Sequence, residues 1–333
     1  MGQVPRRQFL LATGALLGAP LAAYPQAAQR KVRVGMLMAT RPEVTGHFRA
    51  AFTERLAQLG WREGVNIEYT VRCALSDPAK WDSLAAEMVA RKPDLIFVGF
   101  GYYAAVVKKH TRDIPIVFSI SQDPVGEGVV ASLARPGGNA TGTSTRNNEL
   151  TGKRLQLLKE LIPSARRIGV VRRVGVSISP ESTLIFEDLK RSAAQLGLQL
   201  IEVEHQSARA GEFGPAFAQL LRDRVEAIVS VVPWNYTHYR EFAQHALQAR
   251  LPTICDATEF ADAGGLISLS VDRVERYRKS AEYVDRILRG AKPGDLPVDE
   301  PTVFEFVLNL KTARALGLKI PQSILQRVDR IIE

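Results

Sequence analysis

The fold can be inferred from one stretch, Ile116–Ser144, which reads IVFSISQDPVGEGVVASLARPGGNATGTS. Its opening apolar run, Ile116–Phe118, is typical of a buried parallel strand. Asp123–Pro124 then matches an N-cap followed by the first position of a helix, which we expect to reach about Leu133. A turn-forming sequence ends that helix, and Ala140–Ser144 is expected to be a brief strand that leaves the domain. A strand, a helix start and an exit strand so close together predict a site beside a crossover between two domains.

Strand and helix patterns alternate on both sides of this stretch. Strands are predicted at Val32–Met38, Ile67–Arg72, Leu95–Val98, Ile168–Val171, Leu198–Val203, Ala227–Val232 and Pro252–Cys255, with amphipathic helices between them. Such alternation with short loops predicts parallel sheets that carry helices on both faces. A late helix with the apolar face Tyr277–Leu288, an extended stretch and a strand at Val303–Leu308 predict further crossings between lobes, which would form a hinge.

The two halves of the chain also repeat short sequences. Offsets of 134, 137 and 137 residues relate Arg33–Leu37 to Arg167–Val171, Ala57–Gly60 to Ala194–Gly197, and Ile114–Pro115 to Leu251–Pro252. Their common order and near-constant spacing predict two Rossmann-like lobes, although a shared α/β architecture could produce such similarities by chance. We expect lobe 1 to comprise residues 31–145 and about 270–300, and lobe 2 residues 146–269 and about 301–333.

The first residues have the pattern of an export signal. A twin arginine, Arg6–Arg7, is followed by an aromatic residue, the apolar run Leu10–Ala23 and small residues up to Ala28. We expect residues 1–28 to be a twin-arginine-type signal peptide, which places the mature protein in the periplasm. The alternative is a cytoplasmic protein with an apolar start. No later run approaches the roughly 18 apolar residues that a membrane span needs.

The charge and cysteine content of the chain limit the kinds of molecule that it is expected to bind and the bonds that it is expected to form. The 333 residues are 46% hydrophobic and carry a net charge of +9, which falls to +6 when Arg6, Arg7 and Arg30 are left out. The remaining basic residues alternate with acids, as in Arg273–Lys279, which indicates a solvated surface and no nucleic-acid partner. Cys73 and Cys255 could pair in an oxidising compartment or stay as two buried thiols at strand ends.

Ligands of open α/β sheets bind beyond the carboxyl ends of the strands. Candidate ligand-binding residues at those ends are Thr40, Arg41, Gly101, Tyr102, Ser119, Ser121, Asp123, Arg172, Trp234 and Asp256. Arg172 or Arg173 could pair with a carboxylate, and Asp123 or Asp256 could meet an ammonium group. Tyr102 and Trp234 could stack on the body of a ligand. Alternatively, Asp123 only caps a helix, Trp234 only covers an edge, and one of the two arginines points to solvent.

Sequence patterns for catalysis are missing. The five histidines lack metal-ligand spacing, and the chain has no Gly-x-Ser-x-Gly, Cys-x-x-Cys or dinucleotide Gly-x-Gly-x-x-Gly motif. We therefore expect a receptor for a small molecule, with no enzymatic activity, no cofactor and no metal.

The segment Ser121–Asn139 resembles the signature of periplasmic substrate-binding proteins of ABC transporters, specifically the tryptophan/tyrosine-type family. Further matches are Leu59–Asn66, Leu150–Leu155, Glu259–Leu266 and Asn309–Gly317. The resemblance implies a type I periplasmic-binding-protein fold whose two lobes close on a small solute, with delivery to a membrane permease and its ATPase. We expect the protein to act as a monomer.

The chain departs from this family at three strand ends. Many members carry Gly-Thr-Pro at Gly101–Tyr103, an aromatic-Asn-Pro sequence at Arg172–Val174, and Tyr-Gly at Leu269–Ser270. We therefore expect an amino-acid-like or other carboxylate-bearing solute in place of an aromatic amino acid, with Arg172 or Arg173 as its counter-charge. The competing functions are a periplasmic sensor subunit for a membrane signalling protein and an exported hydrolase or transferase. A transcriptional regulator would carry a helix-turn-helix where the export signal stands.

Overall fold

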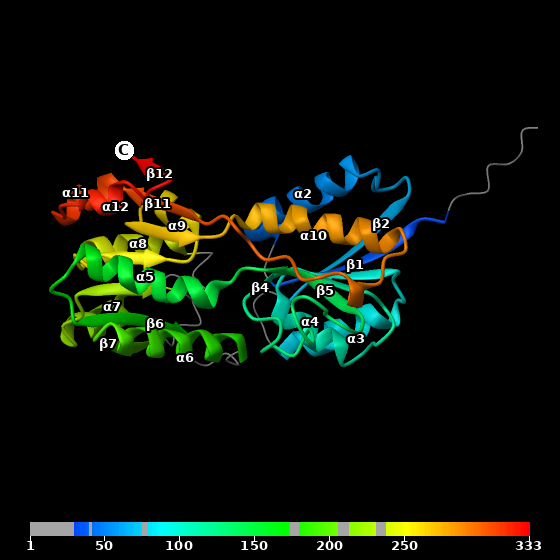
Figure 1. Cartoon of the computed structure of the whole chain (residues 1–333), viewed down its shortest axis with the longest axis horizontal. Coiled ribbons are helices and arrows are strands. Elements are labelled where there is room, and N and C mark those ends of the chain that lie inside the picture. Colours follow the sequence, from blue (N-terminus) through cyan, green and yellow to red (C-terminus); the bar gives the residue numbers. More distant parts are fainter. Residues whose placement is uncertain (1–29, 40–41, 75–78, 174–179, 206–212, 231–237) are drawn as a thin grey trace, which may run out of the picture. The chain divides into compact units, whose positions relative to one another are not determined.

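The computed structural model describes residues 30–39, 42–74, 79–173, 180–205, 213–230 and 238–333. Val32–Glu333 form one unit, which is drawn in Figure 1. The expected signal peptide and the candidate site residues Thr40, Arg41 and Trp234 lie outside the described residues.

The first sheet has five strands in the order β2-β1-β3-β4-β5, and all of its pairs are parallel. The strands are β1 (Val32–Met38), β2 (Ile67–Cys73), β3 (Leu95–Val98), β4 (Ile116–Ser121) and β5 (Ala140–Ser144). The helices between them are α2 (Pro42–Gln58), α3 (Ala79–Ala90) and α4 (Gly101–Lys108). These strands confirm the alternation that the sequence predicts.

The second sheet has seven strands in the order β12-β11-β10-β9-β8-β6-β7. The strands are β6 (Arg167–Arg173), β7 (Gln199–His205), β8 (Ala227–Ser230), β9 (Thr253–Cys255), β10 (Ile267–Ser270), β11 (Glu305–Asn309) and β12 (Arg330–Ile332). The helices are α5 (Asn147–Leu161), α6 (Pro180–Gln195), α7 (Gly214–Arg222), α8 (Tyr239–Gln248), α9 (Thr258–Asp262), α11 (Leu310–Leu316) and α12 (Gln322–Leu325). β10 and β11 pair antiparallel, whereas the other neighbouring strands run parallel.

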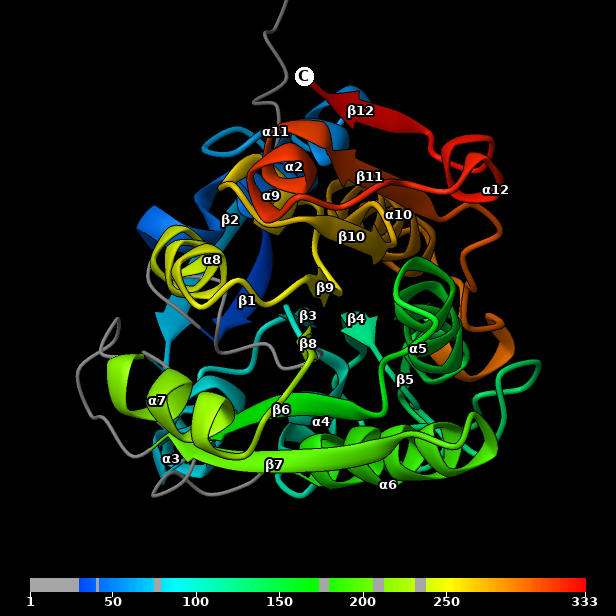
Figure 2. The same ribbon diagram turned by 90° about the vertical axis from the view of Figure 1, so that its left-hand side faces the viewer.

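Alternation of side chains along the strands gives the second sheet two apolar faces. Ile168 and Val170 pack in one cluster with residues of α5 and α6, whereas Val171 packs in another with residues of α7, α8 and α9. Since successive side chains of a strand point to opposite faces, the two clusters lie on opposite sides of the sheet. Figure 2 shows α7 and α8 on the other side of β6 from α5 and α6.

The two sheets repeat one topology. The order β2-β1-β3-β4-β5 recurs as β7-β6-β8-β9-β10. At the start of the first strand of each lobe, a carboxylate accepts a backbone N–H at 2.8 Å: Asp94 from Arg33, and Glu226 from Arg167. Arg33 and Arg167 are the residues at which the sequence repeat begins, so the similarity in sequence corresponds to a similarity in structure.

The helix α10 (Arg273–Leu288) follows the second sheet's first five strands in the sequence but packs on the first sheet. Tyr277, Ala281 and Val284 are fully buried in the cluster that holds β1, β3 and β4. The Tyr277 hydroxyl donates to the Gly99 carbonyl at 3.2 Å, and its ring stacks on Phe48 with centroids 5.2 Å apart. Figure 1 accordingly draws α10 beside α2.

The helix expected from Pro124 to about Leu133 is wrong. Asp123 does cap a turn, because its carboxylate accepts the Gly126 N–H at 2.9 Å, but only a short run of turns follows. Gly128 adopts a φ of +71°, which breaks a right-handed helix after its first turn. The sequence-based prediction recognised Asp123–Pro124 as a helix start but overlooked Gly128, which ends the helix after one turn.

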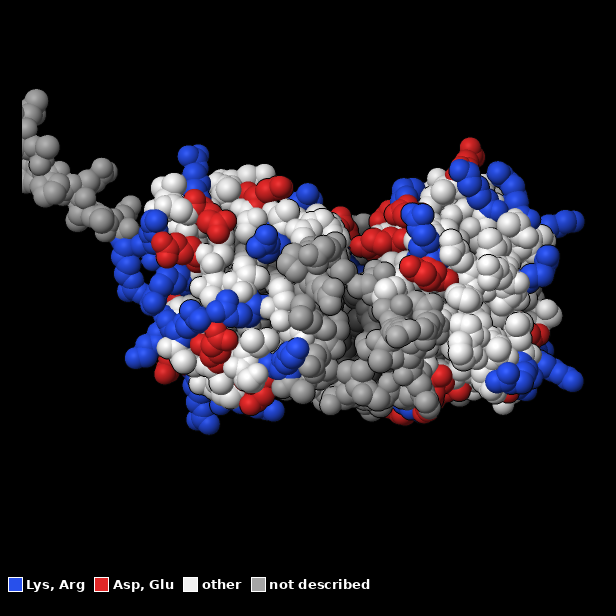
Figure 3. Space-filling model, turned by 180° about the vertical axis from the view of Figure 1, so that it is seen from behind, with Lys and Arg blue, Asp and Glu red and all other residues white. Residues whose placement is uncertain are grey.

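Within the part of the chain that the structure describes, no helix is both long enough and apolar enough to cross a membrane. Cys73, half-buried at the end of β2, and Cys255, buried at the end of β9, do not form a disulfide with each other. Figure 3 shows Lys and Arg interspersed with Asp and Glu on the face it displays.

Candidate ligand-binding site

The carboxyl end of β4 is built around a buried glutamate. The Ser121 hydroxyl donates to the Glu127 carboxylate at 2.7 Å, and the backbone N–H groups of Gln122 and Asp123 each donate to it at 3.2 Å. Burial raises the pKa of Glu127, and these three hydrogen bonds oppose the rise because they stabilise the charged form. The carboxylate thus folds the 121–128 loop back on the end of its own strand.

A glycine lets α4 approach this strand end. A Cβ on Gly101 would lie 2.2 Å from the Ser121 Cβ, so only glycine fits at the first position of α4. Tyr102 follows and is half-buried, with its ring edge-on to Tyr103 at 5.1 Å. Ser119 is fully buried, and its hydroxyl has no hydrogen-bond partner among the described residues.

Ile120 has an unusual backbone conformation at the same strand end. Its φ is +46°, and the register of β4 with β5 breaks between Phe118 and Ser121. Left-handed conformations cost a residue other than glycine roughly 1–2 kcal/mol, and β-branched residues rarely adopt them. Backbone strain of this kind clusters at functional sites.

Ile120 and seven other residues line a pocket where strand ends of both sheets meet the chain crossings. Its lining is Ile120, Gln122, Thr145, Leu150, Arg154, Asp256, Val271 and Arg273. Each of the five polar or charged side chains in this set is less than a tenth exposed. The pocket therefore holds charged groups that are largely withdrawn from water.

The charged groups of this pocket come from three elements. Arg154, on α5, donates from Nε and Nη2 to the Leu269 carbonyl at 2.9 and 2.7 Å. Arg273, the first residue of α10, donates from Nη2 to the Asp256 carbonyl at 2.9 Å and lies 3.6 Å from the Asp256 carboxylate. Two guanidinium groups and one carboxylate thus share the pocket.

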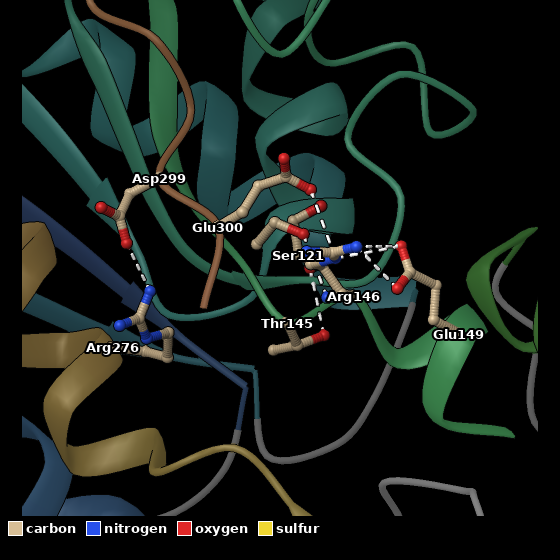
Figure 4. Close-up of polar contacts among 8 residues, drawn as sticks. Ser121, Thr145, Arg146, Glu149, Arg276, Asp299 and Glu300 are labelled. Atoms are coloured by element: carbon tan, nitrogen blue, oxygen red, sulfur yellow. Dashed lines mark hydrogen bonds and ion pairs between the residues drawn. The ribbon is translucent and has the colours of Figure 1, made fainter. Parts of the chain in front are cut away.

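Hydrogen bonds and ion pairs hold together the chain crossings from β5 to α5 and from α10 to β11, beside the pocket (Figure 4). The N–H and hydroxyl of Thr145 both donate to the Ser121 carbonyl, at 2.8 and 3.2 Å. Arg146 follows with a φ of +49°, and its guanidinium pairs with Glu149 at 2.6 Å and lies 3.8 Å from Glu300. Arg146 therefore links the crossing from β5 to α5 with the one that leads to β11.

The crossing that leads to β11 also runs along β5 as a short parallel bridge between Thr143 and Asp299. The Ser144 N–H donates to the Asp299 carbonyl at 2.8 Å, and the Asp299 N–H donates to the Gly142 carbonyl at 3.0 Å. The Asp299 carboxylate pairs with Arg276 of α10 (Figure 4).

The structure brings only some of the predicted site residues together. Ser121 and Asp123 belong to the loop around Glu127, and Asp256 lines the pocket. Arg172 lies elsewhere: its guanidinium is 3.8 Å from both Glu202 and Glu204 of β7 and 5.4 Å from the centroid of the Phe186 ring. The side chain of Arg173 lies outside the described residues, and the ligand contacts of all these residues stay predictions.

Sequence reasoning did not select three polar residues of the pocket: Thr145, Arg154 and Arg273. Arg154 could have been found, because it follows Leu150 by four residues and precedes Leu158 by four, which places an arginine on the buried face of a helix. Arg273 could also have been found, because it directly follows the N-cap Asp272, where the helix dipole disfavours a positive charge.

No group of three or more His, Cys, Asp or Glu residues in the described ranges could hold a metal ion. Cys255 is fully buried, and burial raises the pKa of its thiol.

The chain resembles known proteins in sequence and in structure. It is 27% identical to a tyrosine-binding protein of Clostridioides difficile over 268 residues, which cover 80% of this chain and 76% of the relative. A conserved domain protein of Vibrio cholerae has 27% identity and a TM-score of 0.80, covering 91% of this chain and 100% of its own.

A second solved structure, the ABC domain of Streptococcus pneumonia in complex with L-Trp, has a TM-score of 0.78 at 22% identity and covers 91% of this chain and 100% of its own. These similarities and the strand orders identify a type I periplasmic-binding-protein fold with two α/β lobes. The model of the ABC transporter substrate binding protein family matches residues 43–332, and the chain belongs to that family.

Proposed function

We propose that this protein is the periplasmic solute-binding receptor of an ABC import system. It closes two lobes around a small organic solute, amino-acid-like or otherwise carboxylate-bearing, and delivers it to a membrane permease with its ATPase. The observation that carries the proposal is the pocket in which buried charged groups from Arg154, Asp256 and Arg273 meet at the strand ends. Such a site suits the binding of a small polar solute.

The proposed lobes are residues 31–145 with about 270–300, and residues 146–269 with about 301–333, after a signal peptide at residues 1–28. Three crossings support a hinge between them: β5 to α5, β10 to α10, and α10 to β11. Hinges of this kind absorb changes of φ and ψ in a few residues at the ends of elements. Arg146 and Ile120, both with positive φ, stand at or beside the first crossing.

Relatives support the ligand class. The Clostridioides difficile relative is a tyrosine-binding protein, and the Streptococcus pneumonia structure contains L-Trp. Both amino acids carry one carboxylate and one ammonium group, and the pocket offers guanidinium groups for the first and the Asp256 carboxylate for the second. The departures at Gly101–Tyr103 and Leu269–Ser270 support a solute body that differs from tyrosine and tryptophan.

The mature chain, produced without residues 1–28 and purified without dialysis, tests the receptor function. Mass spectrometry of the molecules released by denaturation is expected to find one small organic acid or amino acid in near-stoichiometric amount. Adding that compound back should raise the unfolding temperature, because a ligand at a hundred times its Kd stabilises the folded state by about 2.7 kcal/mol. The absence of a copurifying solute, together with no thermal shift from amino acids, organic acids or sugars, would contradict the proposal.

The same preparation tests two further parts of the proposal. Light scattering is expected to give the mass of a monomer. Cell fractionation of the full-length chain is expected to recover a shortened protein from the periplasm, whereas replacement of Arg6 and Arg7 by lysine should retain the uncut chain in the cytoplasm.

A further inference from the structure

Glu127 is a buried titratable group that the proposed ligand contacts do not use. It lies in the loop that follows β4 and is 9% exposed. Its Oε1 accepts the N–H groups of Gln122 and Asp123, both at 3.2 Å, and its Oε2 lies 2.7 Å from the Ser121 hydroxyl. This pattern also suits a neutral acid, because Oε1 stays an acceptor and a proton on Oε2 can be donated to the Ser121 oxygen.

Charged groups of several elements lie near this loop. The carboxylate of Asp123, in the same loop, repels a negative charge on Glu127. Lys108 of α4 donates to the Val129 carbonyl at 2.5 Å, and Arg146 pairs with carboxylates beside the crossing from β5 to α5. The pocket at the crossings holds Arg154, Asp256 and Arg273. Asp123 and burial both oppose the ionisation of Glu127.

The segment that Glu127 holds is strained and forms part of the pocket wall. Ile120 has a φ of +46°, a conformation that persists only where neighbouring contacts enforce it. The next residue, Ser121, provides such contacts: its hydroxyl meets Glu127, and its carbonyl accepts the N–H and hydroxyl of Thr145 at 2.8 and 3.2 Å (Figure 4). Ile120, Gln122 and Thr145 all line the pocket. The hydrogen bonds of Glu127 therefore act on the pocket wall and on the crossing from β5 to α5.

We propose that Glu127 is a proton-dependent positioning residue, whose neutral carboxyl group holds Ile120–Asp123 in place and whose ionisation releases that segment. Burial disfavours the charged form, and opening of the segment lets the carboxylate reach water. The closed conformation therefore binds the proton more tightly than the open one, so a rising pH favours opening. Burial correspondingly raises the pKa of Glu127 in this structure.

The release of this segment has a consequence for binding. A solute that contacts the pocket wall in its closed form favours that form, so its affinity should fall as the pH rises through the titration of Glu127. This consequence rests on the proposed receptor function, whereas the movement of the segment does not. The test therefore follows the segment itself, without a ligand.

Nuclear magnetic resonance of the wild-type protein provides the first arm of the test. The carboxyl ¹³C shift of Glu127 gives its titration midpoint, and the protection factors of backbone amides, corrected for the intrinsic exchange rate at each pH, give the opening of the segment. As Glu127 ionises, protection of the Asp123 and Thr145 amides should fall at least about ten-fold, the factor that matches one pKa unit between closed and open forms. The Ile116 N–H, which donates to the Asn139 carbonyl at 2.8 Å at the opposite end of β4, is the internal control and should not change.

Variants provide the second arm. Glu127→Gln imitates the neutral acid, because its amide oxygen can accept the two backbone N–H groups and its NH₂ can donate to Ser121. It should keep the high protection of these amides at every pH. Glu226→Gln is the matched control: one Glu226 oxygen also accepts two backbone N–H groups, at 2.6 and 2.8 Å, but this residue is exposed. It should keep the wild-type pH dependence.

A third variant tests the effect of the neighbouring carboxylate. Asp123→Asn removes a negative charge that raises the pKa of Glu127, so the midpoint of the amide protection should move to lower pH. Asparagine can still accept the Gly126 N–H that Asp123 now accepts, so the turn is kept. Circular dichroism would verify that each variant is folded.

Three results would overturn the inference. The first is constant protection of the Asp123 and Thr145 amides while Glu127 ionises. The second is a Glu127 midpoint at or below that of an unfolded glutamate, about 4.3. The third is a wild-type pH dependence in folded Glu127→Gln; if that variant does not fold, the wild-type titration and Asp123→Asn decide. A protein that binds no solute would still give all of these readouts, so the inference and the receptor function can fail separately.

Discussion

Gly101 shows how one residue determines the geometry of the strand ends. It lets α4 begin directly against Ser121, whose hydroxyl donates a hydrogen bond to the Glu127 carboxylate. Two sequence-predicted residues of the site, Gly101 and Ser121, thus have a packing role that the sequence could not reveal. The close approach of their Cβ positions depends on the pairing of β3 with β4, which brings together residues 20 positions apart.

Gly101→Ala tests this packing. The added Cβ would lie 2.2 Å from the Ser121 Cβ, so we expect a loss of about 1–3 kcal/mol in the free energy of unfolding, as for other overpacked sites. Gly46→Ala, within α2, is the control because nothing lies within 4 Å of its Cβ position. It should stabilise the protein by about 0.5–1 kcal/mol, since alanine favours helices. Equal effects of the two substitutions in urea unfolding would refute this account.

Glu127→Gln tests the buried carboxyl group. Because burial raises the pKa of Glu127 in the folded state, that state binds the proton more tightly than the unfolded chain does. The resulting stabilisation is present below the unfolded pKa, about 4.3, and is lost as the pH rises through the raised folded pKa. Wild type should therefore lose stability relative to Glu127→Gln as the pH rises from about 4.3 towards neutrality. Urea unfolding across this range would measure the difference, and parallel stability curves would contradict the prediction.

Elements were more predictable than the links between them. Apolar periodicity located the strands β1 to β4 and the helix face of α10, because both patterns are local. It failed at Pro124–Leu133, where one glycine of positive φ ends the expected helix, and it did not reveal that β11 pairs antiparallel to β10. Local sequence signals could have drawn attention to Arg154 and Arg273, but they could not indicate the partners of these arginines, which are the carbonyls of Leu269 and Asp256.

The first crossing offers a test at this scale, at Arg146. Its φ of +49° suits asparagine but disfavours a β-branched residue. Arg146→Asn loses ion pairs that solvent screens, so it should change the free energy of unfolding little. Arg146→Val loses the same pairs and adds backbone strain, so it should cost about 1–2 kcal/mol more. Chemical denaturation of both variants measures the difference, and equal stabilities would show that the left-handed conformation is not retained in solution.

At the scale of the whole molecule, one helix packs on a sheet other than the one that precedes it in the sequence. The apolar face of α10 completes the core of the first sheet, although the chain has by then built most of the second. The sequence predicted this return through the assignment of residues about 270–300 to lobe 1, and the core residues of α10 support that proposal. Neither periodicity nor composition could indicate that Tyr277 reaches Gly99.

Tyr277→Ala tests this arrangement. Tyr277 is fully buried, and removal of a buried aromatic side chain typically costs about 3–5 kcal/mol. Hydrogen exchange of backbone amides should become faster in β1, β3 and β4 and change little in β6 to β9. This is expected although β6 to β9 lie nearer to Tyr277 in the sequence. Phe260→Ala, in a cluster of the second sheet, should give the reverse pattern. Faster exchange of β6 to β9 in Tyr277→Ala, with β1 to β4 unchanged, would disprove the assignment of α10.

The position of α10 also has a consequence for biosynthesis. Ser144, the last residue of the first sheet, emerges from the ribosome 133 residues before Tyr277. At 5–20 residues per second, the nascent first sheet spends on the order of ten seconds without the helix that covers its core. During that interval apolar side chains such as Phe97 and Phe118 lack part of their native cover. We therefore expect the N-terminal half of this chain to expose apolar surface for longer than the finished fold does, which makes it prone to aggregation while it is being made.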